Sequence, residues 1–130
     1  MSREILQPAG WARPRGYANG IAAEGRQVFV SGQIGWDGEQ RFVSDDFAAQ
    51  TRQALANVIA VLACAGGRPE HLVRMTWYVT SRDEYNDSLA EIGAAYRELI
   101  GRNYPAMSVV VVAGLLEPRA KVEIEATAVV

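Results

Sequence analysis

At 130 residues the chain is long enough for one domain, and its 49% hydrophobic and 22% charged residues are ordinary for a globular protein. A formal net charge of −2 argues against a nucleic-acid surface, which needs clustered positive charge. One histidine and one cysteine cannot build a His-rich or thiolate metal cluster, and no apolar run is long enough to span a membrane. We therefore expect a single cytoplasmic domain over residues 1–130, without a metal site or a membrane partner.

The first half of the chain predicts two strands followed by a helix. Residues 17–22 and 27–33 have the composition of short strands and flank a Glu-Gly turn, which favours a hairpin. The hydroxyl and acidic side chains of residues 44–46 are typical of a helix start, because they accept hydrogen bonds from free backbone amides. Apolar residues then recur every three or four positions over 47–62, and glycines at 66–67 end the helix.

The second half predicts a strand, a second helix and two further strands. Residues 71–81 are rich in β-branched and aromatic side chains, which favour a strand. Ser81 and Glu84 have the spacing of a capping box, and the helix that follows ends at Gly101. Residues 106–113 are almost purely apolar, whereas the last run of Val, Ile and Ala contains two glutamates.

The predicted order β-β-α-β-α-β-β indicates an α+β fold, with a mixed sheet and two helices packed on one of its faces. Val109 to Val112 are apolar toward both faces, so a monomer would leave an apolar sheet face exposed. We therefore expect the chain to assemble through its sheet, with ligand sites in clefts between subunits.

Four short motifs occur in a characteristic order and spacing. They are "SGQI" at the end of the second predicted strand, "AAQTRQALANV" in the first helix, "YPA.S" before the fourth strand and "VEIEA.A" near the end. Together, from Tyr17 to Val129, they resemble the Rid family (RidA/YjgF type). The resemblance implies a chorismate-mutase-like fold, a homotrimer and active-site clefts at the subunit interfaces. It also implies hydrolysis of reactive imines and enamines to ketones and ammonia without a cofactor.

The resemblance assigns roles to individual residues. Glu123 matches the cleft glutamate of the family, which holds or activates the attacking water, and is the expected catalytic residue. Ser31 and Gly32 match the serine and glycine of "SGQ", whose side chain and amide face the ligand. Tyr17 matches the tyrosine of the N-terminal family motif, although "PRGYANG" lacks the proline usually found just before it.

One family feature is missing. The imine deaminases have arginine in "PARS", whereas this chain reads "PAMS", so Met107 stands where that arginine would bind the substrate carboxylate. Val109 occupies a position that is often cysteine, and Gly93 one that is often asparagine. Successive side chains of a strand point to opposite faces, so Met107 and Val109 share one face. This predicts an apolar wall for the substrate pocket. We expect a substrate without an α-carboxylate, unless another arginine reaches the cleft from a loop: Arg13, Arg15, Arg41 or Arg119.

Structural interpretations stand beside the functional ones. Glu123 and Glu125 share a strand face, which is also typical of a solvated edge strand, and that interpretation is kept for Glu125. The other candidates are given structural roles: packing or interface contacts for Trp11 and Trp77, turn packing for Trp36, and an inert buried thiol for Cys64.

Three functions follow from this sequence. The first is a Rid-type hydrolase or deaminase that acts on an imine, enamine or related C=N substrate without a cofactor. The second is a non-catalytic, trimeric small-molecule-binding protein that has kept the cleft and lost the chemistry. The third is an endoribonuclease or translation inhibitor, against which the sequence pI of about 5.4 argues.

Overall fold

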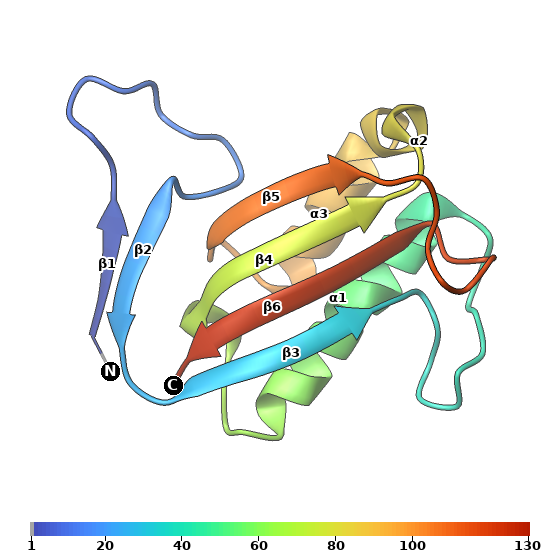
Figure 1. The fold of residues 1–130 in the computed structure, drawn as a ribbon, viewed down its shortest axis with the longest axis horizontal. Coiled ribbons are helices and arrows are strands. Elements are labelled where there is room, and N and C mark those ends of the chain that lie inside the picture. Colours follow the sequence, from blue (N-terminus) through green and yellow to red (C-terminus); the bar gives the residue numbers. More distant parts are fainter. Residues whose placement is uncertain (1) are drawn as a thin grey trace.

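A four-stranded mixed sheet forms the centre of the computed structural model, which describes residues 2–130 (Figure 1). Its strand order is β3-β6-β4-β5, with β6 antiparallel to both neighbours and β4 parallel to β5. The strands are β3 (Gln27–Gln33), β4 (Leu72–Val79), β5 (Ala106–Val111) and β6 (Val122–Val129). The last strand of the chain is therefore central, and the edge-strand interpretation of its two glutamates is wrong.

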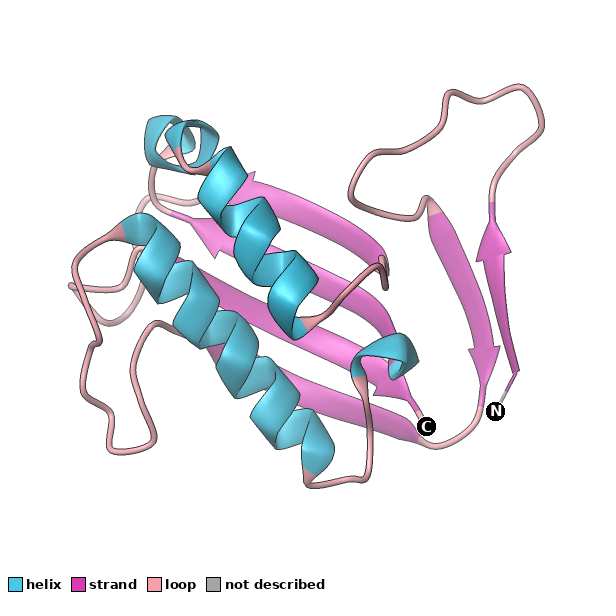
Figure 2. Cartoon of the chain, turned by 180° about the vertical axis from the view of Figure 1, so that it is seen from behind, coloured by secondary structure: helices cyan, strands magenta, loops and turns pink. Residues whose placement is uncertain are grey.

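The two long helices, α1 (Phe47–Ala63) and α3 (Leu89–Leu99), cover the same face of the sheet (Figure 2). This arrangement confirms the predicted α+β fold class. The second predicted helix is interrupted at Ser88, which separates α3 from the short α2 (Arg82–Asp87). A 3-10 turn, η1 (Pro69–His71), precedes β4. Within residues 2–130, no helix combines the length and the hydropathy needed to pass through a membrane.

The helix starts agree with the sequence. The Asp46 carboxylate accepts a hydrogen bond from the Ala49 amide at 3.0 Å, and the Ser81 hydroxyl accepts one from the Glu84 amide at 3.1 Å. Each bond satisfies an amide that has no partner inside its helix. The expectation for Cys64 is wrong, because this residue lies just past the end of α1 and is exposed.

Alternation along the inner strands sorts side chains between the helix side and the open side of the sheet. Every second residue of β6 from Val122 to Ala128 is buried beneath the helices, and the residues between them are half-buried on the open face. That open face also carries the exposed side chains of Phe29 and Val110 near its outer strands. It is therefore mixed in polarity, rather than the apolar face that the sequence predicts.

The hairpin predicted between residues 17–22 and 27–33 does not form. β2 (Gly20–Glu24) pairs instead with β1 (Ser2–Leu6), a strand that the sequence did not indicate, and β3 pairs with β6. Gly25 turns the chain between β2 and β3 with a φ of 147°, and a Cβ there would lie 2.8 Å from the Val130 carbonyl oxygen. The β1-β2 hairpin consequently lies beside the end of the sheet at which β4 and β5 begin (Figure 1).

Two polar side chains of α1 fasten the loops around the sheet. Gln50 is fully buried; its amide donates to the Ser44 carbonyl at 3.0 Å and accepts from the Lys121 amide at 2.9 Å. Asn57 donates to the Trp36 carbonyl at 2.8 Å. These bonds hold the segment that follows β3 and the segment that precedes β6. The "AAQTRQALANV" motif therefore helps to position the two strands that carry "SGQI" and "VEIEA.A".

Candidate functional site

A bulge in β3 shapes the first group of candidate residues. Val30 pairs with Ala126 and Gln33 pairs with Ile124, so Ser31 and Gly32 together face a single residue of β6. Such bulges redirect side chains and are frequent beside functional sites. This one brings the two residues of "SGQ" to the open face of the sheet.

Gly32 of β3 lies against the side chain of Glu123. A Cβ built at Gly32 would lie 2.6 Å from Cδ of Glu123 and 2.8 Å from its Cγ. Only glycine therefore leaves room for the Glu123 carboxylate in its present position. Ser31 lies next to this contact, and its hydroxyl accepts a hydrogen bond from the Gln33 side chain at 3.3 Å.

The neighbouring acid, Glu125, has a different environment. The Tyr78 hydroxyl donates a hydrogen bond to the Glu125 carboxylate at 2.7 Å. This bond, followed by burial, raises the pKa of Tyr78 above its usual value. Glu125 is thus engaged by a neighbouring strand, whereas the Glu123 carboxylate lies against the bulge.

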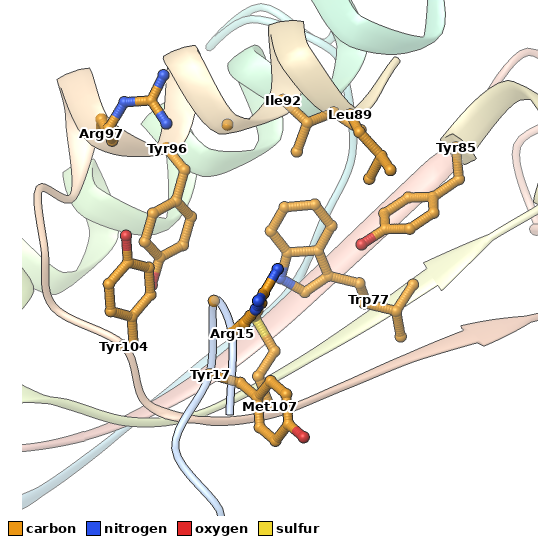
Figure 3. Close-up of a pocket in the computed structure, with 13 residues that line it drawn as sticks. Arg15, Tyr17, Trp77, Tyr85, Leu89, Ile92, Tyr96, Arg97, Tyr104 and Met107 are labelled. Atoms are coloured by element: carbon orange, nitrogen blue, oxygen red, sulfur yellow. The ribbon is translucent and has the colours of Figure 1, made fainter. Parts of the chain in front are cut away.

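The second group lines a cavity of about 530 Å³ on the helix side of the sheet (Figure 3). Met107 and Val109 of β5 form part of its wall, and Gly93 of α3 faces them. Tyr17 reaches the cavity because the Ala18 amide bonds the Pro105 carbonyl at 3.0 Å, which holds this loop at the start of β5. Aromatic and aliphatic side chains complete the lining: Trp77, Tyr85, Leu89, Ile92, Tyr96 and Tyr104.

Two arginines, Arg15 and Arg97, also line this cavity. Of the arginines considered from the sequence, Arg41 pairs instead with Asp37 and Arg119 with Asp45. Sequence reasoning missed Arg97, which stands one helical turn after Gly93. Arg97 Nη1 lies 3.4 Å from the Cβ that any other residue would carry at that glycine. The position that is often asparagine in the family thus leaves room here for a guanidinium group.

The sheet separates the two groups within one chain. Met107 and Val109 point toward the helices and pack against the core, whereas Glu123 lies on the open face with Ser31 and Gly32. The two groups can therefore meet at one substrate only if the second comes from another copy of the chain. Within residues 2–130, no three His, Cys, Asp or Glu side chains are arranged to hold a metal ion.

Comparison with known proteins identifies the relatives of this chain. Residues 11–130 match the model of the family described as Endoribonuclease L-PSP. The crystal structure of YyfB, a protein of unknown function in the Rid family from Yersinia pestis, superposes with a TM-score of 0.88. It is 32% identical, and the match covers 100% of both chains. The chain belongs to the Rid family.

Two of the other relatives of this Rid protein have a named activity, and a third is known from its crystal structure. The 2-iminobutanoate/2-iminopropanoate deaminase of Salmonella typhimurium is 34% identical over 132 residues, which covers 99% of this chain and 98% of the relative. The human protein of the same name is 30% identical, and the match covers 80% of this chain and 73% of the human chain. The YjgF gene product of Escherichia coli superposes with a TM-score of 0.68 at 34% identity, over 87% of each chain.

Proposed function

We propose that this Rid protein hydrolyses the C=N bond of an imine, or of an enamine after its tautomerisation, with Glu123 as the proton carrier. The observation that carries the proposal is the Glu123 carboxylate held against Gly32 at the bulge of β3. Relatives named as 2-iminobutanoate/2-iminopropanoate deaminases, at 33–34% identity, support the reaction class.

The reaction needs a water directed at carbon and a proton for nitrogen, and one carboxylate can supply both functions in turn. Glu123 accepts a proton from the water as the C–O bond forms. It returns this proton to nitrogen, which gives a carbinolamine. Glu123 then carries the hydroxyl proton of the carbinolamine to nitrogen; the C=O bond forms, the C–N bond breaks, and ammonia leaves a ketone behind. Carbon keeps its oxidation state throughout, so the reaction requires proton transfer and no redox partner.

The proposed site lies between two chains of a homotrimer. One chain supplies the wall of the cavity, and a second supplies the open sheet face with its carboxylate. The paired sets are Tyr17, Met107 and Val109 from the first chain and Ser31, Gly32 and Glu123 from the second. Phe29, 72% exposed, and Val110, 41% exposed, support assembly, because they leave apolar surface on the open face of a single chain.

The substrate is proposed to lack an α-carboxylate. Hydrogen bonds to a charged group contribute about 1.5–3 kcal/mol each, and Met107 offers none where the family arginine would bind. A carboxylate at this position would lose its water and gain only thioether contacts. Arg15 and Arg97 are the two cations that could replace the missing arginine from elsewhere in the cavity.

Met107→Arg tests the proposal, read together with Glu123→Gln. If the hydrolytic half of the site is intact, restoring the guanidinium should raise 2-iminobutanoate hydrolysis by about tenfold or more, equivalent to about 1.4 kcal/mol. Glu123→Gln should abolish hydrolysis in either background, because the amide keeps the shape but cannot take a proton. Met107→Gln is the matched control, since it adds polarity and similar length without charge and should give no gain.

Two other functions are the outcomes that would displace this proposal. An assembled Met107→Arg protein without any gain, and a wild type inactive on a panel of imines, would favour a binding protein. RNA binding that weakens steeply with salt would favour the endoribonuclease of the family description. We do not expect this outcome, because several cations that could contact RNA phosphates already pair with acids in this structure: Arg41, Arg52, Arg68, Arg119 and Lys121.

A further inference from the structure

Trp77 presents a buried hydrogen-bond donor without an acceptor. Its side chain is only 2% exposed, and within residues 2–130 its Nε1 is the buried side-chain nitrogen or oxygen that lacks a partner. Buried donors are nearly always paired, because an unpaired one loses its water and gains nothing in return. An unpaired donor in a native chain is therefore a place to look for a ligand.

The indole lies among the side chains that line the cavity between β5 and α3 (Figure 3). Tyr96 and Tyr104 form a second flat surface in that cavity, with parallel rings whose centroids are 5.5 Å apart. The Tyr96 hydroxyl is already bonded to the Asn103 carbonyl, which holds this ring in place. The cavity thus combines fixed aromatic faces with a buried donor that has no partner among the described residues, and its volume of about 530 Å³ is in the range of small-molecule sites.

The cations of the cavity favour the same kind of ligand. Arg15 and Arg97 line it, and a planar guanidinium group stacks on aromatic rings. Met107 lines it as well, with a long thioether side chain that changes rotamer easily. Nε1 is covered in this structure, so an acceptor atom reaches it only when a side chain of the lining moves.

We propose that this cavity binds a planar aromatic group of the substrate, and that an acceptor atom on the ring receives a hydrogen bond from Trp77 Nε1. The substrate class is then an imine or enamine that carries an aromatic or heteroaromatic ring with a nitrogen or oxygen acceptor. This inference rests on the proposed function, because it takes the cavity to be the substrate side of the cleft.

Binding of a matched pair of probes tests the inference without turnover. Quinoline and naphthalene have the same shape, and only quinoline carries an acceptor. Quinoline should bind the assembled wild-type protein about fivefold more tightly, the usual value of one hydrogen bond. In ¹⁵N-labelled protein it should also move the indole N–H resonance of Trp77, identified by its loss in Trp77→Phe.

The variants separate the donor from the aromatic surface. Trp77→Phe keeps a flat ring and should reduce the preference for quinoline to about onefold, whereas Trp11→Phe, at a 62% exposed position, should leave it unchanged. Equal binding of the two probes to wild type, or an unmoved Trp77 resonance with quinoline bound, would overturn the inference. The resonance is read in wild type, so this test does not depend on how well Trp77→Phe folds.

The same probes distinguish failure of this inference from failure of the proposed function. If wild type prefers quinoline through Trp77 but hydrolyses no imine, the aromatic binding site is supported and the proposed hydrolase function is refuted. If wild type hydrolyses imines but binds both probes equally, the hydrolase function is supported and the aromatic binding site is refuted.

Discussion

Gly32→Ala should impair hydrolysis while leaving the fold intact. The added Cβ would lie 2.6 Å from Cδ of Glu123, where carbon atoms normally stay about 3.5–4.0 Å apart. The atoms that must move belong to the end of a flexible side chain, so the carboxylate should shift by about 1 Å and the strands should stay in place. A displacement of about 1 Å at a reacting group can cost about 100-fold in rate, or roughly 2.7 kcal/mol in barrier.

The assay is ammonia release from the imine that wild type hydrolyses fastest, together with the thermal unfolding midpoint. Gly114→Ala is the matched control, because a Cβ there meets nothing within 4 Å and should leave both quantities unchanged. An assembled Gly32→Ala protein with kcat/KM within twofold of wild type would refute the reasoning. It would mean that the position of Glu123 against β3 does not matter to the reaction.

Three further results are expected. Wild type should hydrolyse 2-iminobutanoate more slowly than a relative that has the family arginine. Equal turnover would mean that Arg15 or Arg97 binds the substrate carboxylate instead, and the variants Arg15→Gln and Arg97→Gln would identify which one. Ultracentrifugation at micromolar concentration should show a species of three chains, and a stable monomer would contradict the shared cleft. Burial raises the pKa of Tyr96 above its usual 10, so the folded chain keeps this proton to higher pH than the unfolded chain. The free energy of unfolding measured with urea should therefore stay level up to about pH 10 and fall above it. The fall should be smaller in Tyr96→Phe.

Local features of the fold could be predicted because each depends on a few neighbouring residues. Asp46 and Ser81 cap helices as expected, since a side-chain oxygen three residues before a free amide is a local signal. Strand pairing is not local. The Glu-Gly turn after β2 suggested a hairpin, but the partner of β2 is β1, whose five residues show no alternation of their own.

The candidate site shows the same division. Period-2 alternation placed Met107 and Val109 on one face of β5, and both line one cavity. Alternation cannot say which face the helices cover, so it could not show that Glu123 lies on the other side of the sheet. The bulge beside Glu123 was also invisible, because it is defined by the pairing of β3 with β6.

Trp77 illustrates what packing adds to sequence. The sequence predicted a packing or interface role for this residue, and its side chain is 2% exposed. Whether an indole nitrogen finds an acceptor depends on every element that packs around it, here β5, α3 and the loop before β2. The sequence could therefore predict a packing residue, but not an unpaired donor.

The separation of the two residue groups by the sheet has a genetic consequence. Suppose that each cleft takes its cavity from one chain and its carboxylate from another. A chain with a harmful substitution at Met107 and a chain with one at Glu123 are then defective in different halves of the cleft. A mixed assembly of the two would contain some clefts built from both intact halves. Two inactive alleles of this gene should then complement each other in one cell, whereas two alleles impaired on the same face should not.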